Sequence, residues 1–310
     1  MRAEQVQSND GEADRRMAAD QQRARELLGH LVSNPEATMD DYRNLYEEVL
    51  TQFVLPEDAV SESVDAGGVP AYWVSAPGAA PSRVVVLVHG GGWTMGSAKG
   101  YRELGYRISA ASDHRVLVVD YRLAPEHPYP APHEDVLSCL PLGSPARGRP
   151  SVALVGDSAG GGLVAGAALA LRDEDVEQPT CIVLFSPLLD LAGQSVSLVE
   201  RAHLDPLPAA VLVENMGGAY LGGRTPQETP FASPLHADPH GLPPVLAFSG
   251  TDEGLHDDAV RFVEKVGEAG GDASYIEGDG QIHIWPLFNF LPEAATAVAQ
   301  AGTFVGKHAR

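Results

Sequence analysis

The sequence predicts an α/β fold built on a doubly wound, mostly parallel sheet with an antiparallel N-terminal edge. Short apolar runs alternate along the chain with stretches of helical spacing, which is the order expected of strand–helix–strand units. Glycine-rich turns directly follow two of these runs, at residues 90–92 and 160–162. No stretch approaches the roughly 18 uninterrupted apolar residues of a transmembrane helix, so we expect no membrane span.

Length and charge limit the classes of protein further. The chain has 310 residues, and we expect one domain over residues 16–310 after a disordered N-terminal segment, residues 1–15. The net charge of −21 comes from 42 acidic against 21 basic residues, which disfavours nucleic acid and anionic membranes as partners. Residues 1–16 are polar and lack the apolar core of a secretory signal, which favours a cytoplasmic location. Cys139 and Cys181 have no metal-binding spacing, so we expect no metal and no disulfide framework.

The N-terminal part is predicted to contain two helices and a hairpin. Residues 16–31 place several apolar side chains near one helical face. Residues 38–53 do the same, and Thr38 can cap that helix. Residues 60–64 and 69–74 then read as two strands joined by a glycine turn, which would supply the antiparallel edge.

The remainder of the chain alternates strand and helix. Apolar or β-branched runs predict strands at residues 83–89, 115–120, 152–155, 181–185, 245–249 and 273–277. Longer stretches with helical spacing predict helices at residues 133–140, 163–172, 204–221, 257–269 and 292–308. The proline-containing stretch 140–150 is predicted to form a non-helical link before the strand at 152–155.

Residues 156–160, Gly-Asp-Ser-Ala-Gly, match the G-x-S-x-G pattern of a nucleophile elbow. A predicted strand precedes them and a predicted helix follows, which is the context that this motif requires. The tight turn would expose the Ser158 hydroxyl at the end of the strand and aim the Ala159 amide at an attacked carbonyl oxygen. Ser158 is therefore the candidate nucleophile.

A serine hydroxyl needs a base to take its proton and a carboxylate to orient that base. In this kind of fold the acid and then the histidine follow the serine in the chain. The histidines after Ser158 are His203, His236, His240, His256, His283 and His308. His283 is the candidate base, because it follows the last predicted strand, and active-site groups of an open α/β sheet lie at strand ends.

Several segments together resemble the hormone-sensitive-lipase family of α/β-hydrolases, bacterial esterases with an H-G-G-G motif. The matching segments are residues 89–93 (His-Gly-Gly-Gly-Trp), 120–131, 156–161, 185–187, 233–235, 241–244 and 283–288. The resemblance implies an α/β-hydrolase fold with a helical cap over the serine, formed by residues 16–55 and about 187–230. The family's usual methionine two residues before the histidine is Gln281 here.

The resemblance also implies a role for each matching position. Ser158 would be the nucleophile and His283 the general base. The backbone amides of Gly91, Gly92 and Ala159 would form the oxyanion hole. Three consecutive glycines suit this role physically, because bare backbone can approach the tetrahedral intermediate closely.

The catalytic acid has two candidates. Family members carry an acid-x-Leu-x-Asp pattern, which falls on Glu253 without a gap, with Leu255 and Asp257 matching. Asp252 fits only with a one-residue insertion. We therefore favour Glu253 and keep Asp252 as the alternative.

The expected function is hydrolysis of a short-chain acyl ester through an acyl-enzyme, as in a serine carboxylesterase. An N-deacylase, a lactonase or an acyl transferase would use the same triad, and these alternatives stay open. A non-catalytic small-molecule binder is disfavoured, because Ser158, Glu253 and His283 are all present. We expect a small-molecule acyl substrate, no cofactor, and no nucleic acid or membrane as a partner; a homodimer stays open.

Overall fold

The computed structural model describes residues 2–34, 36–140 and 151–309, with side chains from Arg15 onward. Within these residues, eight strands form one sheet in the order β1-β2-β4-β3-β5-β6-β7-β8. The strands are β1 (Val60–Ala66), β2 (Val69–Ser75), β3 (Ala80–Val88), β4 (His114–Val119), β5 (Ser151–Asp157), β6 (Ile182–Phe185), β7 (Val245–Gly250) and β8 (Ala273–Gly278). β2 pairs antiparallel with β1 and β4, and the other neighbours pair in parallel, so the predicted sheet is confirmed.

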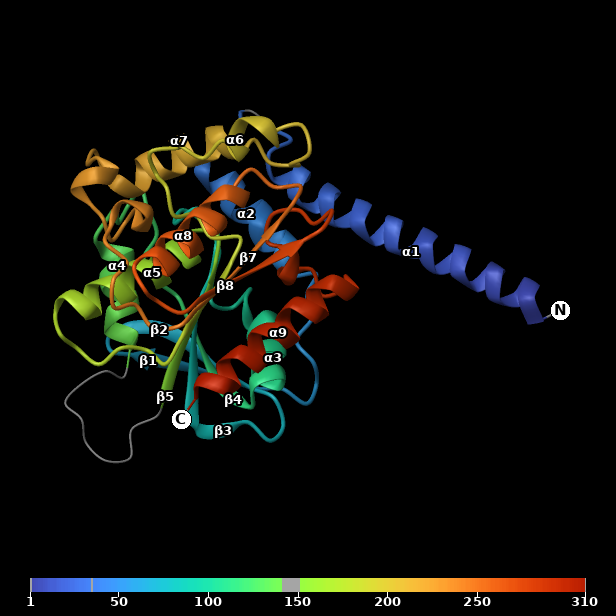
Figure 1. Cartoon of the computed structure of the whole chain (residues 1–310), viewed down its shortest axis with the longest axis horizontal. Helices are drawn as coiled ribbons and strands as arrows, with labels where there is room; N and C mark the ends of the chain where they lie inside the picture. The colour runs from blue at the N-terminus through green and yellow to red at the C-terminus, as the bar shows by residue number, and fades with distance from the viewer. Residues whose placement is uncertain (1, 35, 141–150, 310) are drawn as a thin grey trace.

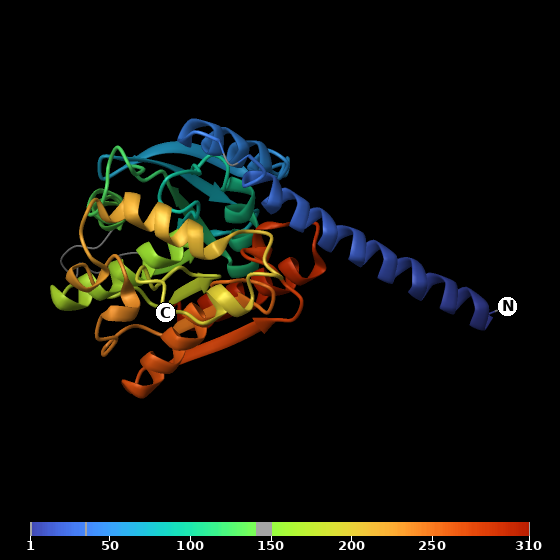
Figure 2. The same cartoon turned by 90° about the horizontal axis from the view of Figure 1, so that it is seen from above.

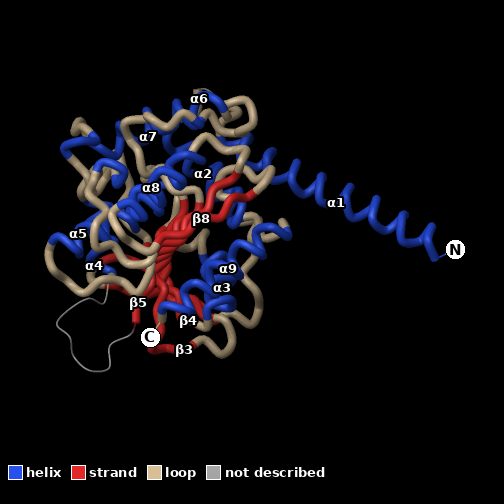
Figure 3. Tube along the Cα trace, in the orientation of Figure 1, coloured by secondary structure: helices blue, strands red, loops and turns tan. Residues whose placement is uncertain are grey.

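The main helices cover both faces of this sheet. They are α1 (Arg2–Leu31), α2 (Met39–Leu50), α3 (Arg102–Ser112), α4 (Ala131–Cys139), α5 (Ala159–Asp173), α6 (Ser197–Glu200), α7 (Ala209–Leu221), α8 (His256–Glu268) and α9 (Pro292–His308). α3 and α9 pack on one face, and α4, α5 and α8 pack on the other (Figures 1 and 3). Among the described residues, no helix combines the length and apolar character needed to cross a membrane.

The central strand β3 explains why two helical layers are needed. Val84, Val86 and Val88 lie in the core cluster that includes α5, whereas Val85 and Leu87 lie in the cluster that includes α3 and α9. Successive side chains of a strand point to opposite faces, so the apolar run from Val84 to Val88 must be covered on both sides.

The N-terminal helix is longer than the sequence indicated. We expected a helix from residue 16 and no regular structure over residues 1–15, but α1 begins at Arg2. Its N-terminal half projects away from the rest of the molecule (Figures 1 and 2). This half is rich in Ala, Glu, Gln and Arg, which favour helix without an apolar stripe, and the apolar stripe was the signal that we used.

Two further helices differ from the sequence-based expectation. α3 was not predicted, since Gly105 interrupts its pattern; a Cβ there would lie 3.1 Å from Cγ2 of Val118, so glycine lets α3 approach β4. α7 begins at Ala209 and not at residue 204, because Pro206 and Pro208 keep the preceding residues out of the helix. Most of the predicted link at 140–150 lies outside the described residues.

Residues 16–55 and 187–230 are referred to below as the cap, because both segments line the pocket above Ser158. The first segment contains the C-terminal half of α1 and all of α2, and the second contains α6 and α7. In Figure 1 these helices lie together on one side of the molecule. Thr38 caps α2 as predicted, accepting a hydrogen bond from the Asp41 amide.

Candidate active site

Ser158 stands in a sharp turn between β5 and α5. Its φ of 50° and ψ of −120° are strained for a residue with a side chain, which is the kind of strain found at functional sites. The turn also requires Gly160, because a Cβ there would lie 2.1 Å from the Val88 carbonyl oxygen. The strand, turn and helix predicted around Ser158 are thus present.

The structure brings Ser158, His283 and Glu253 together from three separate segments. His283 Nε2 lies 3.0 Å from Ser158 Oγ, and His283 Nδ1 lies 2.7 Å from Glu253 Oε2. In the tautomer that suits this geometry, Nδ1–H donates to the carboxylate and Nε2 accepts from the serine hydroxyl. All three side chains are buried.

Glu253 is held in place by its other carboxylate oxygen. Oε1 accepts a hydrogen bond of 2.7 Å from the Gly250 amide at the end of β7. Ser158 directly follows β5, and His283 lies in the loop that follows β8. The sheet therefore places all three groups on one edge, as expected of a parallel α/β sheet.

The environment of His283 favours its protonated form. Burial lowers the pKa of His283, but the hydrogen bond and charge of Glu253, with the charges of Asp205 and Asp157, outweigh burial and raise this pKa above its usual 6.5. A histidine of raised basicity is suited to accept the proton of a serine hydroxyl.

Asp252, the alternative acid, lies elsewhere. Its carboxylate forms an ion pair with Arg25 of α1, and its amide donates a hydrogen bond of 3.0 Å to the Gln281 carbonyl. Gln281 accepts a hydrogen bond of 3.1 Å from Gln21, also of α1. Asp252 and Gln281 thus connect the cap to the loops that carry Glu253 and His283.

The glycine loop after β3 lies beside Ser158. Gly91 and Gly92 line the same pocket as Ser158, and Gly91 has φ of 104°, where a Cβ would lie 2.3 Å from the Met95 carbonyl oxygen. Ala159 is the first residue of α5, so its amide lacks an acceptor within the helix. These amides are the donors expected to hold an oxyanion.

A buried hydrogen-bonded chain supports this loop, and the sequence analysis missed its members' roles. The Gly90 amide donates to Asp157 Oδ1 at 2.9 Å, and the Tyr101 hydroxyl donates to Asp157 Oδ2 at 2.8 Å. The Tyr46 hydroxyl of α2 lies 2.6 Å from that of Tyr101. Burial raises the pKa of Asp157 to about 6, against the effect of these donors. Asp157 was visible as the second residue of the elbow motif, but no sequence signal marked Tyr101.

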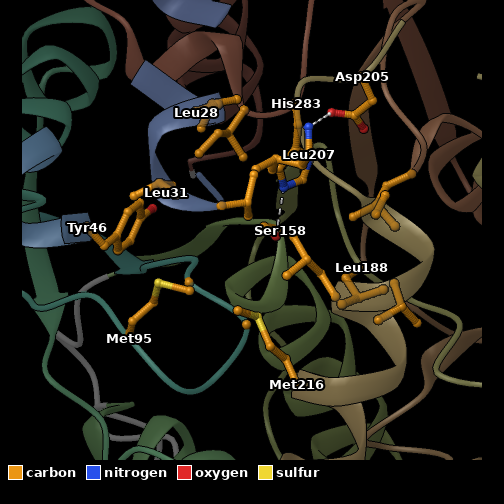
Figure 4. A pocket seen from close by; sticks show the side chains of 18 of the residues that line it. Leu28, Leu31, Tyr46, Met95, Ser158, Leu188, Asp205, Leu207, Met216 and His283 are labelled. Carbon is orange, nitrogen blue, oxygen red and sulfur yellow. Dashed lines mark hydrogen bonds between the residues drawn. The ribbon is translucent and has the colours of Figure 1, made fainter. Parts of the chain in front are cut away.

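The pocket above Ser158 is mostly apolar (Figure 4). The first cap segment contributes Leu28, Leu31, Val32, Tyr42 and Tyr46, and the second contributes Leu188, Asp205, Leu207, Ala209, Leu212, Val213 and Met216. Within the described residues, no group of three or more His, Cys, Asp or Glu side chains is arranged to hold a metal ion.

The sheet topology and the serine–histidine–carboxylate arrangement define a hydrolase of the α/β type. Comparison with known proteins agrees, since residues 85–287 match the model of a family described as alpha/beta hydrolase fold. An acetyl-hydrolase of Streptomyces hygroscopicus is 36% identical over 247 residues, which cover 78% of this chain and 81% of that protein. An esterase of Acinetobacter venetianus is 31% identical over 228 residues, which cover 73% and 75%.

Solved structures indicate which family of α/β-hydrolases the chain belongs to. An esterase described as a member of the bacterial hormone-sensitive lipase family has a TM-score of 0.88 and 39% identity, covering 94% of this chain and 98% of that one. A protein described as EstE5, soaked with p-nitrophenyl butyrate, has a TM-score of 0.85 and 33% identity, covering 93% of this chain and 98% of that one. The chain belongs to the α/β-hydrolase family and, within it, to the hormone-sensitive lipase family of esterases. It is accordingly a hydrolase.

Proposed function

We propose that this hydrolase is a serine carboxylesterase that cleaves short-chain acyl esters, with Ser158 as nucleophile, His283 as general base and Glu253 as the orienting acid. The observation that carries the proposal is the continuous hydrogen-bonded path from Ser158 Oγ through His283 to Glu253 at the base of an apolar pocket. The names of two similar proteins, an acetyl-hydrolase and an esterase, support the same reaction.

In this mechanism His283 takes the proton of Ser158 as Oγ attacks the ester carbonyl. The carbonyl oxygen becomes an oxyanion, which the amides of Gly91, Gly92 and Ala159 would stabilise; each such donor is worth about 3 kcal/mol. The imidazolium then gives its proton to the leaving alcohol, and an acyl-enzyme remains. Water, activated by His283, releases the acid and regenerates Ser158.

The lining of the pocket suits the hydrocarbon chain of an acyl group. The walls near Ser158 carry Leu28, Leu31, Met95 and Met216, which approach from both cap segments and the glycine loop. Apolar walls of this kind bind a hydrocarbon chain by removing it from water. The name of the similar acetyl-hydrolase indicates a short acyl group, so we expect preference for esters with few acyl carbons.

Activity profiling of the purified protein tests the proposal. The substrates are p-nitrophenyl esters with acyl chains of C2 to C12 and the matched p-nitroanilides. We expect the highest kcat/KM among the shortest esters and little hydrolysis of the amides. Faster turnover of an amide, or of a lactone tested alongside, would favour the deacylase or lactonase alternative. No ester turnover in a folded protein would refute the proposal.

Assembly and location form a secondary part of this proposal. Light scattering on the purified protein distinguishes a homodimer from a monomer, because it measures the mass directly. Both described cysteines, Cys139 and Cys181, are free and buried, which suits a reducing compartment such as the cytoplasm. Fractionation of cells that produce the protein tests the location.

A further inference from the structure

Asp205 brings a carboxyl group from the cap to the catalytic pocket. It lies in the loop between α6 and α7, is half-buried, and lines the pocket. In Figure 4 its side chain points toward His283. Among the described residues that line this pocket, Asp205 is the one Asp or Glu.

Two backbone amides fix the Asp205 carboxylate. Oδ2 accepts a hydrogen bond of 2.7 Å from the amide of Gly254, and Oδ1 accepts one of 2.9 Å from the amide of Leu207. Gly254 directly follows Glu253, so the first of these bonds joins the cap to the loop that carries the catalytic acid. The contact between the cap and this loop is tightly packed, since a Cβ on Gly254 would lie 2.6 Å from Cβ of Ala209 in α7.

We propose that Asp205 is a positioning residue for the catalytic pair: it holds the Glu253 loop through Gly254, and its negative charge favours the protonated form of His283. The inference rests on the proposed function, because it takes His283 as the base. No sequence motif that we used marks Asp205, and Glu253 remains the carboxylate that hydrogen-bonds the imidazole.

The electrostatics of the site agree with this role. His283 becomes an imidazolium when it accepts the proton of Ser158, and a nearby anion lowers the energy of that state. The acidic groups that act on His283 are Glu253 from the β7–α8 loop, Asp205 from the cap and Asp157 from β5; burial lowers the pKa of His283 and these three raise it. Burial raises the pKa of Asp205, and the charge of His283 opposes that rise.

The arrangement couples the cap to the chemistry. Asp157 is the last residue of β5, and Glu253 follows β7 at the same edge of the sheet. Asp205 belongs to the cap, so its charge acts on His283 only while the cap is in place.

The test is the pH dependence of Ser158 labelling by a fluorophosphonate, measured with kcat/KM for p-nitrophenyl butyrate. The variant Asp205→Asn removes the charge with little change in shape. The acid limb is the fall in rate at low pH, where His283 becomes protonated. In Asp205→Asn we expect this limb to move to lower pH by about 0.5 to 1 unit, because a negative charge near the imidazole has been lost. We also expect its plateau rate to fall by about tenfold. Asp205→Glu keeps the charge and should keep the acid limb near that of the wild type.

Asp257→Asn is the matched control. Asp257 Oδ2 accepts a hydrogen bond of 2.9 Å from the Ser197 amide, so this carboxylate joins the cap to the first turn of α8. Its Oδ1 lies 3.0 Å from His256 Nδ1. Its substitution removes one charge and one cap contact away from the pocket. We expect it to leave the acid limb in place. Circular dichroism checks folding, and Asp205→Ser serves as a second neutral variant if Asp205→Asn does not fold.

The outcomes separate the two proposals. A wild-type protein that is not labelled at Ser158 contradicts the proposed function. Normal wild-type labelling, with an acid limb unmoved in the neutral Asp205 variants, overturns only the role of Asp205. An equal shift of the acid limb in Asp257→Asn would also overturn the role of Asp205, since the effect would then follow from any loss of charge or cap contact.

Discussion

Arg25 of α1 forms an ion pair with Asp252, whereas the next residue in the chain, Glu253, hydrogen-bonds His283. The Arg25 guanidinium also donates to the carbonyl oxygens of Leu204, at 2.7 Å, and Gly280, at 3.4 Å. It therefore contacts the second cap segment and both loops that carry catalytic side chains. Two adjacent carboxylates thus have different partners, and substitution can separate their roles.

Glu253→Gln should lower kcat by about 10⁴, because an amide can no longer favour the productive tautomer of His283 or stabilise its imidazolium. The measurement is steady-state hydrolysis of p-nitrophenyl butyrate, with circular dichroism to check folding. Asp252→Asn is the matched control and should retain most of kcat, since it loses only the ion pair to Arg25. The reverse result would make Asp252 the acid.

Ser158→Ala should abolish ester turnover and covalent labelling together. The wild-type protein treated with a fluorophosphonate should gain one adduct, which peptide mass spectrometry should locate at Ser158. Ser138→Ala is a suitable control, since that hydroxyl binds the Glu134 carbonyl on α4, far from the pocket. An intact Ser158→Ala protein with wild-type turnover would contradict the assignment.

The pH dependence of kcat/KM should follow His283. Its pKa is raised above 6.5 in the folded protein, and only the neutral imidazole can accept the serine proton, so activity should fall as pH drops through a midpoint above 6.5. His283→Ala should abolish the activity, and with it the fall in rate at low pH. His256→Ala is the comparison: His256 hydrogen-bonds Glu277 at 2.9 Å, so it should keep the limb.

Tyr101→Phe should weaken the oxyanion loop. The substitution removes the donor to Asp157 Oδ2 and leaves a buried carboxyl group without that partner, which should cost about 2 kcal/mol of unfolding free energy. Because Asp157 also binds the Gly90 amide, we expect kcat/KM to fall by about tenfold. Tyr106→Phe, which loses only an exposed hydrogen bond to Asp58, should change neither quantity much. Equal effects in both variants would remove the special role of Tyr101.

The sequence predicts the sheet well, because buried parallel strands are continuous apolar runs with little resemblance to loops. It also predicts Ser158 and His283, since the elbow motif and the order of the partners constrain them. The choice between Glu253 and Asp252 depended on an ungapped match, and only the folded loop distinguishes which carboxylate turns inward.

What the sequence did not predict depends on how separate segments dock. Tyr101 and Tyr46 belong to ordinary aromatic patterns. The hydrogen-bonded chain from Tyr46 through Tyr101 to Asp157 forms only when distant segments pack together. Asp205 lies in the loop between two cap helices, and in the sequence it resembles an ordinary acidic loop residue beside Pro206. Its proximity to His283 is set by the position of α7, which no local pattern encodes.

The long-range contacts of the cap determine when the enzyme can first act during its synthesis. A nascent chain that has emerged from the ribosome as far as α5 already contains Ser158 and the glycine loop. It still lacks Glu253 and His283, and Gln21 and Arg25 have no loops to bind until residues 252 and 281 follow. With Glu253 and His283 in the proposed roles, we expect chains that end before residue 283 to have no esterase activity.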